Sequence, residues 1–545
     1  MFRCAKILSD KSQKRKGSLA RSTSSVGLAT LASRILGLVR DIVIAGFYGA
    51  GLHTDAFFVA FKIPNLLRRL VAEGALASAF VPVFTDQQEL GDQEANSAIR
   101  ASCGFTLLLT TSLTLVGIIF ADQITALFAP GFVIGSDKFD LASELMRMMF
   151  PYIVMVSLLS LASAVLNVLG YFALPAFAPA ILNISLILFA LVFSGYGIVS
   201  LAWGVLAGGL LALAPQILLL KKIGYSFLPA SPFGSDVVAK LCRLMAPAVL
   251  SASVYQFIVF INTLLASFLT EGSISWLYYA DRLFQFPLGV FSIALATALL
   301  PALARSVSKG DLPEAQNLFN NALAWVGFIT VPAAFGLALL SDQLVNLIYS
   351  RGSFDQVSVE NTASALVAYS LGLWAVSVQT LIIRMYLARK NTLIPALVSV
   401  FSLCCNLLLA LSLMGPIPPQ GSAGLTNSLV SMQSILPAFN YGHDGLALAG
   451  SLTAFLTVIS LSFLLPKIGS SIQFSIQTIK LFKAIASSLA MTLAIYLIGS
   501  LELPVFVEVV ASVVIGAVVY GICSLLLKSE EALQLTSQFK KWRGN

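Results

Sequence analysis

Charge is scarce in this chain. Asp, Glu, Lys and Arg make up 11% of its 545 residues and hydrophobic residues make up 58%, whereas an ordinary soluble domain carries about 25% charged residues. A soluble domain cannot bury so much apolar surface, so the composition excludes a soluble enzyme. Runs such as residues 105–120 are apolar on every side, which is typical of a membrane-spanning helix of about 20 residues. The sequence therefore predicts an all-α polytopic membrane protein.

Catalytic and metal-binding patterns are also missing. The two histidines, His53 and His443, belong to no HExxH or nucleophile-elbow pattern, and the six cysteines are scattered without CxxC spacing. No GxxxxGK[ST] loop for the phosphates of ATP is present. We therefore expect no enzyme activity, no metal site and no cofactor. Transport by such a chain would be coupled to an ion or to the membrane potential.

Apolar runs bounded by Gly, Pro and charged residues predict fourteen membrane-spanning helices. Basic residues favour the cytoplasmic side of short loops. Among the 33 Lys and Arg residues, only Lys138 and Arg351 fall in loops after odd-numbered spans. This asymmetry places both termini in the cytoplasm and explains the net charge of +8 without a nucleic acid partner. The spans are expected near residues 24–50, 55–74, 101–120, 146–169, 174–194, 198–220, 244–269, 274–304, 320–340, 362–388, 393–414, 444–466, 481–500 and 504–527.

An internal repeat relates the two halves of the chain. Tyr196-Gly197 recurs as Tyr441-Gly442, and Lys222-Ile223-Gly224 recurs at the same offset as Lys467-Ile468-Gly469. The sixth and twelfth spans are therefore expected to be counterparts, and parallel repeats of this kind are an arrangement used by transporters. The expected organisation is a basic cytoplasmic tail (1–23), an N-lobe of six spans (24–222), a cytoplasmic linker (223–243), a C-lobe of six spans (244–469) with a polar insert (415–440), two further spans (470–527) and a cytoplasmic C-terminal tail (528–545).

Arginines inside the first span are the clearest functional signal, because an arginine at mid-membrane costs about 2.5–3.5 kcal/mol on insertion scales. Arg34 and Asp41 lie nearly two helical turns apart on one face. Asp41 is therefore expected to compensate Arg34 and to leave Arg40 for another partner.

Two later spans carry similar charges. Arg69 and Glu73 have the i, i+4 spacing of a helical ion pair, which leaves Arg68 for something else. The eighth span contains the adjacent Asp281 and Arg282. These charges could be ion pairs that lock the bundle. We favour arginines that bind an anionic substrate, because the planar guanidinium suits bidentate phosphate contacts.

Prolines inside two of these spans are hinge candidates. Pro64 interrupts the second span and Pro287 the eighth. Each removes one backbone hydrogen bond and kinks its helix. A static bend is the alternative interpretation.

Three segments resemble one known family. The stretch from Ser33 to Phe84, which contains SRILGLVRD, TDAFF and PNLLRR, is similar to the opening of the MurJ/MviN family, the bacterial lipid II flippases of the MOP exporter superfamily. FAPAILNISLI (Phe177 to Ile187) and the stretch from Ser275 to Leu303, which contains YYADR, fit the same family. The resemblance runs over residues 24–527.

The resemblance implies two six-helix lobes and two further helices that hold a polyprenyl tail. It also implies a flippase that moves lipid II from the inner to the outer leaflet of the bacterial inner membrane by alternating access, for cell-wall synthesis. Lipid II, membrane lipids and other wall-synthesis proteins would be its partners. The matching motifs carry over Arg34, Arg40, Arg68, Arg282 and Asp55 as substrate-binding residues.

Other functions remain open at this stage. A related MOP-type protein could transport a drug or another lipid-linked oligosaccharide. A membrane scaffold for wall synthesis would need no cavity arginines, and an integral glycosyltransferase would depend on loop carboxylates. The fold alone does not decide among them.

Overall fold

The structure is a computed structural model that describes residues 29, 31–69, 76–418, 423–468, 473–501 and 503–543. Within these ranges the chain is helical and has no β-strand beyond an isolated bridge between Met414 and Asn440. The described residues fall into two compact units, one of residues up to 128 and 134–256, the other of residues 129–133 and 257 onward. The expected lobe boundaries stay predictions, and the expected tail of residues 1–23 lies outside the described residues.

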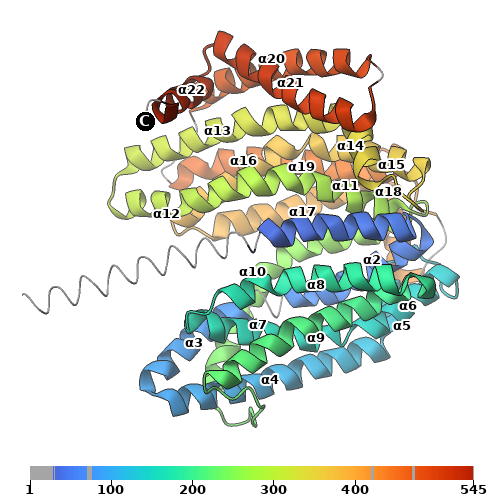
Figure 1. Ribbon diagram of the computed structural model, residues 1–545, viewed down its shortest axis with the longest axis vertical. Coiled ribbons are helices and arrows are strands. Elements are labelled where there is room, and N and C mark those ends of the chain that lie inside the picture. Colours follow the sequence, from blue (N-terminus) through green and yellow to red (C-terminus); the bar gives the residue numbers. More distant parts are fainter. Residues whose placement is uncertain are drawn as a thin grey trace, which may run out of the picture. The chain divides into compact units, whose positions relative to one another are not determined.

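The first unit is built from a helix over residues 31–48 and the helices that follow it (Figure 1). Its other elements are α2 (Leu52–Leu67), α3 (Ala77–Leu90), α4 (Asp92–Ile119), α5 (Ala121–Phe128), α6 (Asp137–Met149), α7 (Tyr152–Val168), α8 (Ala173–Val192), the short 3-10 turn η2 (Ser194–Tyr196) and α9 (Val199–Lys222). The long helix α10 (Asp236–Ala266) crosses the division between the units.

The second unit begins with one long helical stretch in three parts. They are α11 (Ser273–Pro287), the π-helix η3 (Leu288–Ile293) and α12 (Ala294–Ser308). The elements that follow are α13 (Leu312–Leu339), α14 (Ser341–Tyr349), α15 (Gln356–Ser370), α16 (Leu373–Ala388), α17 (Leu393–Leu413), α18 (Ala423–Gln433), α19 (Gly442–Leu464), the 3-10 turn η4 (Leu465–Ile468), α20 (Phe474–Gly499), α21 (Val505–Leu526) and α22 (Glu530–Arg543).

The same pairing of helices recurs in the two units. In the first unit α2 packs on α6, α4 on α7, and α9 on both α7 and α8. In the second unit α11 packs on α15, α13 on α16, and α19 on both α16 and α17. Helices α9 and α19 are thus structural counterparts, as the repeated sequence of the sixth and twelfth spans predicts. Helices α20 and α21 are additional, and α20 packs against both α21 and α13 (Figure 1).

Each unit has its hydrophobic core among equivalent helices. Phe80 and Phe84 of α3 are fully buried in a cluster with residues of α4, α7 and α9. In the second unit the fully buried Phe319 of α13 and Tyr386 of α16 pack with residues of α12 and α19. The Tyr386 hydroxyl donates a hydrogen bond to the Leu461 carbonyl over 2.8 Å, so this large ring is buried without an unsatisfied polar group. Truncation of such a ring typically costs about 3–5 kcal/mol.

Two glycines let α8 and α9 approach closely. A Cβ at Gly204 would lie 3.3 Å from the Leu186 Cα, and one at Gly208 would lie 2.8 Å from Leu182 Cδ1. They are four residues apart and form the small-xxx-small pattern by which membrane helices associate. The Ser185 hydroxyl of α8 donates to the Gly204 carbonyl across this contact over 2.8 Å.

In the part of the chain that the structure describes, ten helical stretches are long and apolar enough to span a membrane, and α15 with α16, bent by 45°, makes an eleventh. The chain is therefore a multi-pass membrane protein. Each of these eleven stretches overlaps an expected span. The described parts of the expected spans 24–50, 55–74 and 244–269 are not long and apolar enough to be counted with them. The first two of these three contain the candidate charged residues, which lower their apolar character.

Candidate functional site

Arg40 is buried in the first unit, in the helix of residues 31–48. Its Nε and Nη2 atoms donate to Asp41 Oδ1 over 2.9 and 2.7 Å, and its Nη1 atom donates to Asn183 Oδ1 of α8 over 3.0 Å. Arg40 and Asp41 are only 8% and 1% exposed. Asn183 also donates to the Ser33 carbonyl over 3.1 Å, so it ties the helix to α8. Asp41 therefore neutralises Arg40 directly.

The predicted pairing of Arg34 with Asp41 is wrong. A long arginine side chain can fold back onto the adjacent carboxylate, and this contact replaces the one expected from helical facing. The Arg34 side chain is exposed instead, and no hydrogen bond or ion pair links it to another of the residues that the structure describes. Arg34 is thus an accessible cation in a helix whose neighbours Leu31 and Ile35 are exposed apolar residues.

Arg68 lies at the end of α2 and is partly buried. Its Nε atom donates to Asn65 Oδ1, one turn earlier, over 2.9 Å. The Tyr152 phenol at the start of α7 lies within electrostatic range of both Arg68 and Arg40, which places these two arginines in one polar region of the first unit. Arg69 is exposed, and its predicted partner Glu73 lies outside the described residues.

Asp55 is separated from Arg68 along α2. It is almost completely buried near the start of the helix, and its Oδ2 atom accepts a hydrogen bond from Lys138 Nζ of α6 over 2.7 Å. Thirteen residues of helix separate Asp55 from Arg68, which corresponds to about 20 Å. The structure therefore does not bring Asp55 together with Arg68. The sequence analysis did not identify Lys138 as a partner of Asp55, because Lys138 belongs to no motif and stood out only as a basic residue in an expected outer loop.

Arg282 belongs to the second unit and is held by an aromatic ring. Its guanidinium carbon lies 4.8 Å from the centroid of Tyr278, and its Nη2 atom donates to the Tyr278 hydroxyl over 2.8 Å. This cation–π contact orients the guanidinium without neutralising its charge. The adjacent Asp281 accepts a hydrogen bond from Gln285. Tyr278 is the first residue of the YYADR motif, four residues before Arg282, and the i, i+4 spacing could have identified it.

Both hinge candidates adjoin wide helical turns. Pro64 lies inside α2, and residues 68–69 just after that helix have π geometry. Pro287 ends α11, and the π-helix η3 follows directly. Proline leaves one backbone carbonyl without its helical hydrogen bond, and a wide turn accommodates this irregularity. Wide turns are also frequent at functional sites. A change of angle at either proline stays a prediction.

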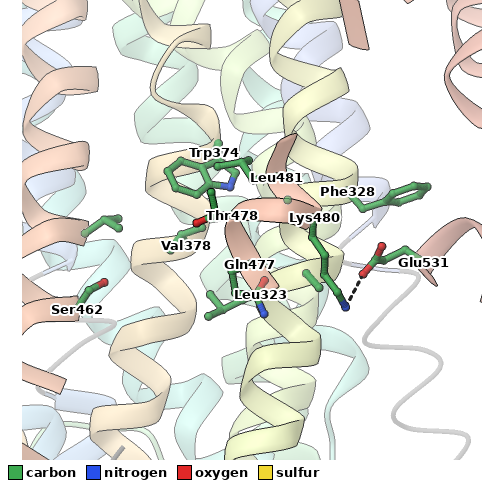
Figure 2. Close-up of a pocket in the computed structure, with 13 residues that line it drawn as sticks. Leu323, Phe328, Trp374, Val378, Ser462, Gln477, Thr478, Lys480, Leu481 and Glu531 are labelled. Atoms are coloured by element: carbon green, nitrogen blue, oxygen red, sulfur yellow. Dashed lines mark ion pairs between the residues drawn. The ribbon is translucent and has the colours of Figure 1, made fainter. Parts of the chain in front are cut away.

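A cavity of about 130 Å³ lies in the second unit between α20 and the helices α13, α16 and α19 (Figure 2). Its wall is mainly apolar, and α22 contributes Glu531 at one end. There Lys480 Nζ lies 2.7 Å from Glu530 Oε2 and 3.1 Å from Glu531 Oε1. The lining residues are Leu323, Ala324, Gly327, Phe328, Trp374, Val378, Val458, Ser462, Gln477, Thr478, Lys480, Leu481 and Glu531.

Among the described residues, no cluster of three or more His, Cys, Asp or Glu side chains is arranged to hold a metal ion. The guanidinium groups described above can bind an anion, and the apolar wall of the cavity can hold a hydrocarbon chain.

Comparison with known proteins gives a consistent family. The family model described as "Lipid II flippase MurJ" matches residues 44–518. A probable lipid II flippase MurJ of Vibrio cholerae is 37% identical over 451 residues, which cover 81% of each chain. The lipid II flippase MurJ of Burkholderia cenocepacia is 36% identical over 419 residues, which cover 75% of this chain and 81% of that relative.

Solved structures show the same fold. A structure of lipid II flippase MurJ in an inward closed conformation matches with a TM-score of 0.77 and 27% identity, over 94% of this chain and 99% of that one. An inward-facing multidrug resistance MATE transporter of the MOP superfamily matches with a TM-score of 0.65 at 14% identity, over 80% of this chain and 94% of that one. The second likeness concerns the fold alone. With a family model that matches most of its length and relatives well above 30% identity, the chain belongs to the MurJ lipid II flippase family.

Proposed function

We propose that this protein moves lipid II, an undecaprenyl diphosphate-linked peptidoglycan precursor, from the inner to the outer leaflet of the bacterial inner membrane by alternating access. The observation that carries the proposal is an accessible, unneutralised guanidinium at Arg34 within a mainly apolar helix. Such a cation is costly against lipid, and a diphosphate would offset that cost. The relatives named above share this substrate by name.

The arginines would contribute differently to binding of the anionic substrate. Arg34 is exposed and has no ion pair with the described residues, and the Arg68 guanidinium donates to the neutral amide of Asn65. Arg40 is already bonded to Asp41, so the pair adds no net charge and would serve to position the helix and to offer one guanidinium edge. Arg282, oriented by Tyr278, is the candidate anion ligand within the second unit.

The hydrocarbon tail would lie along α20 and α21. The cavity beside α20 supports this assignment because apolar side chains of four helices line it (Figure 2). Asp55 is less well suited to bind substrate directly, since Lys138 already occupies its carboxylate. We assign Asp55 a supporting role at the start of α2.

The proposed topology has fourteen spans with both termini in the cytoplasm. Eleven apolar stretches support this topology. The three remaining expected spans, which are charged or interrupted, would complete the two lobes.

The cycle would be driven by an ion or by the membrane potential, because a flippase without an ATP site needs another energy source. Cationic drugs are disfavoured as cargo, since the candidate ligands are themselves cations.

Growth of a strain depleted of its own flippase tests the proposal. Alanine at Arg34, Arg68 or Arg282 should each reduce complementation, and the triple variant should abolish it, while the amount of protein in the membrane stays normal. Lysine at these positions should restore growth only in part, because an ammonium cannot make the bidentate phosphate contact. Transport of lipid II into proteoliposomes, compared with other undecaprenyl-linked glycans, identifies the cargo.

Arg147 provides the matched control. It forms an ion pair with Asp122 over 2.6 Å, and both side chains are about half exposed. Surface pairs of this kind contribute about 0–1 kcal/mol, so Arg147→Ala should support normal growth. Full growth of the triple variant would refute anion binding by these arginines.

A further inference from the structure

The insert, residues 415–440, is a segment without charge. No Asp, Glu, Lys, Arg or His occurs between Lys390 and His443, a stretch that contains the whole of α17 and the insert. A water-exposed segment of ordinary composition would carry about one charged residue in four. The insert therefore differs in composition from a loop that projects into water, although it lies outside the predicted spans.

The insert is firmly attached where α17 ends and α19 begins. Gln433 of α18 donates to the carbonyls of Leu411 and Gly415 over 2.8 and 2.7 Å. Its side-chain oxygen accepts a hydrogen bond from the Ile417 amide over 2.9 Å. The Phe439 amide donates to the Ser412 carbonyl over 2.8 Å. These bonds fix the level of the insert at the end of two membrane helices.

Helix α18 has a buried face and an exposed face. Thr426, Leu429 and Gln433 are buried, and Leu425, at about 40° from Leu429 on a helical wheel, borders them with an exposed apolar side chain. Asn427, Ser428 and Ser431 are exposed polar residues. The exposed face of the helix thus carries both apolar and polar side chains, and none of them is charged.

Exposed apolar side chains continue from α18 to the membrane helices. Ile435 is 85% exposed, and the stacked rings of Phe439 and Tyr441 are 47% and 54% exposed. Leu408 of α17 and Leu452 of α19 are exposed on the neighbouring spans. Aromatic residues with half-exposed rings are typical of the boundary between lipid and water.

From these observations we infer that residues 423–441 lie in the membrane–water interface, with Leu425 and Ile435 among the lipid chains, Phe439 and Tyr441 at headgroup level, and the Ser and Asn side chains of α18 toward water. On the proposed topology this is the outer leaflet. The insert has no charged side chain with which to form an ion pair to a protein partner. Because the segment is neutral, its association with lipid is independent of lipid charge and of salt. The inference does not depend on the transported substrate.

Fluorescence of the full chain in phosphatidylcholine vesicles tests the inference. A fluorescent amino acid is incorporated at Ile435 or, as a matched control, at the neighbouring Ser434; a second pair is Leu425 and Asn427. We expect spin-labelled lipids to quench the probe several-fold more strongly at Ile435 and Leu425 than at the control positions. Aqueous iodide should show the reverse order, and anionic lipid or added salt should change neither result.

Two outcomes would overturn the inference. Equal quenching by iodide at both members of each pair would place the insert in water. Protection of Ile435 and Leu425 from both quenchers would indicate a protein contact, such as a second copy of the chain. Use of two independent pairs keeps the test decisive if one position does not tolerate the probe.

Discussion

The arginines of the candidate site differ in what surrounds each guanidinium. Arg40 is enclosed by a carboxylate and an amide, whereas Arg34 is exposed and has no such contact with the described residues. Arg282 lies over an aromatic ring. Loss of Arg40 would therefore disturb the fold, and loss of Arg34 would remove only a ligand.

Stability measurements separate these two roles. Asp41→Asn should lower the free energy of unfolding by about 3–5 kcal/mol, because it leaves the buried Arg40 without its counter-charge. Arg34→Ala should change that free energy by no more than about 0.5 kcal/mol and still reduce lipid II transport. Thermal unfolding in detergent, followed beside transport in proteoliposomes, checks both expectations. An unchanged unfolding temperature for Asp41→Asn would contradict the assignment.

The identities of the charged residues could be predicted from the sequence, but their partners could not. The helical spacing predicted a pair of Arg34 with Asp41, because it describes only the directions of the Cα–Cβ bonds. It does not describe how far an arginine side chain can bend. Asn183 lies on a helix remote in sequence, and nothing in its own segment marks it as a ligand of Arg40. The contact of Lys138 with Asp55 could not be predicted either, because only the packing of α2 on α6 brings the two residues together.

At the scale of elements, α22 is fastened across one end of the cavity beside α20. Lys480 of α20 bonds to Glu530 and Glu531, and the Ser529 hydroxyl donates to Glu531 Oε2 over 2.7 Å. Burial alone would raise the pKa of Glu531, but the hydrogen bonds from Ser529 and from its own amide, together with the Lys480 ammonium, outweigh burial and lower it. The helix is thus held by an ionised carboxylate.

This attachment should weaken in acid. A lowered pKa means that Glu531 stabilises the docked helix fully above the ordinary glutamate pKa of about 4.3, and that this contribution is lost as the pH falls through the lowered value. Glu531→Gln should remove about 1–3 kcal/mol at neutral pH and speed amide exchange in α22. Glu530→Gln is the matched control with a smaller effect, because its side chain is 68% exposed. Equal exchange in both variants would rule out this attachment.

At the scale of the whole molecule, the helical class and the repeat could be predicted, because composition and apolar run length act along the entire chain. The recurring pairs α8 with α9 and α17 with α19 follow the repeated sequence. The helices that carry charge or contain breaks could not be located with equal accuracy, since their stability in the membrane comes from neighbours and not from their own hydropathy. The division at residue 256, within α10, has no sequence signal.

Reporter fusions test the predicted topology. A phosphatase active only outside the cytoplasm should be active when fused after residue 134 or 440 and inactive after residue 224, 310 or 545. A fluorescent protein that folds only in the cytoplasm should give the complementary pattern. Activity of the phosphatase at the C-terminus would exclude an even number of spans with both termini inside the cell.

The π-helix η3 changes how the long helical stretch from Ser273 to Ser308 should be compared among relatives. A wide turn accommodates one extra residue, so the sequence pattern of apolar residues after it is shifted by one position, or about 100° on a helical wheel. Leu299 and Leu303 reach the core cluster with that shift in place. The apolar periodicity therefore has to be restarted at Ala294. In a relative that lacks one residue at this turn, every later apolar residue would have to occur one position earlier in the sequence pattern to reach the same core. A gap in an alignment of this stretch should therefore be placed at this turn.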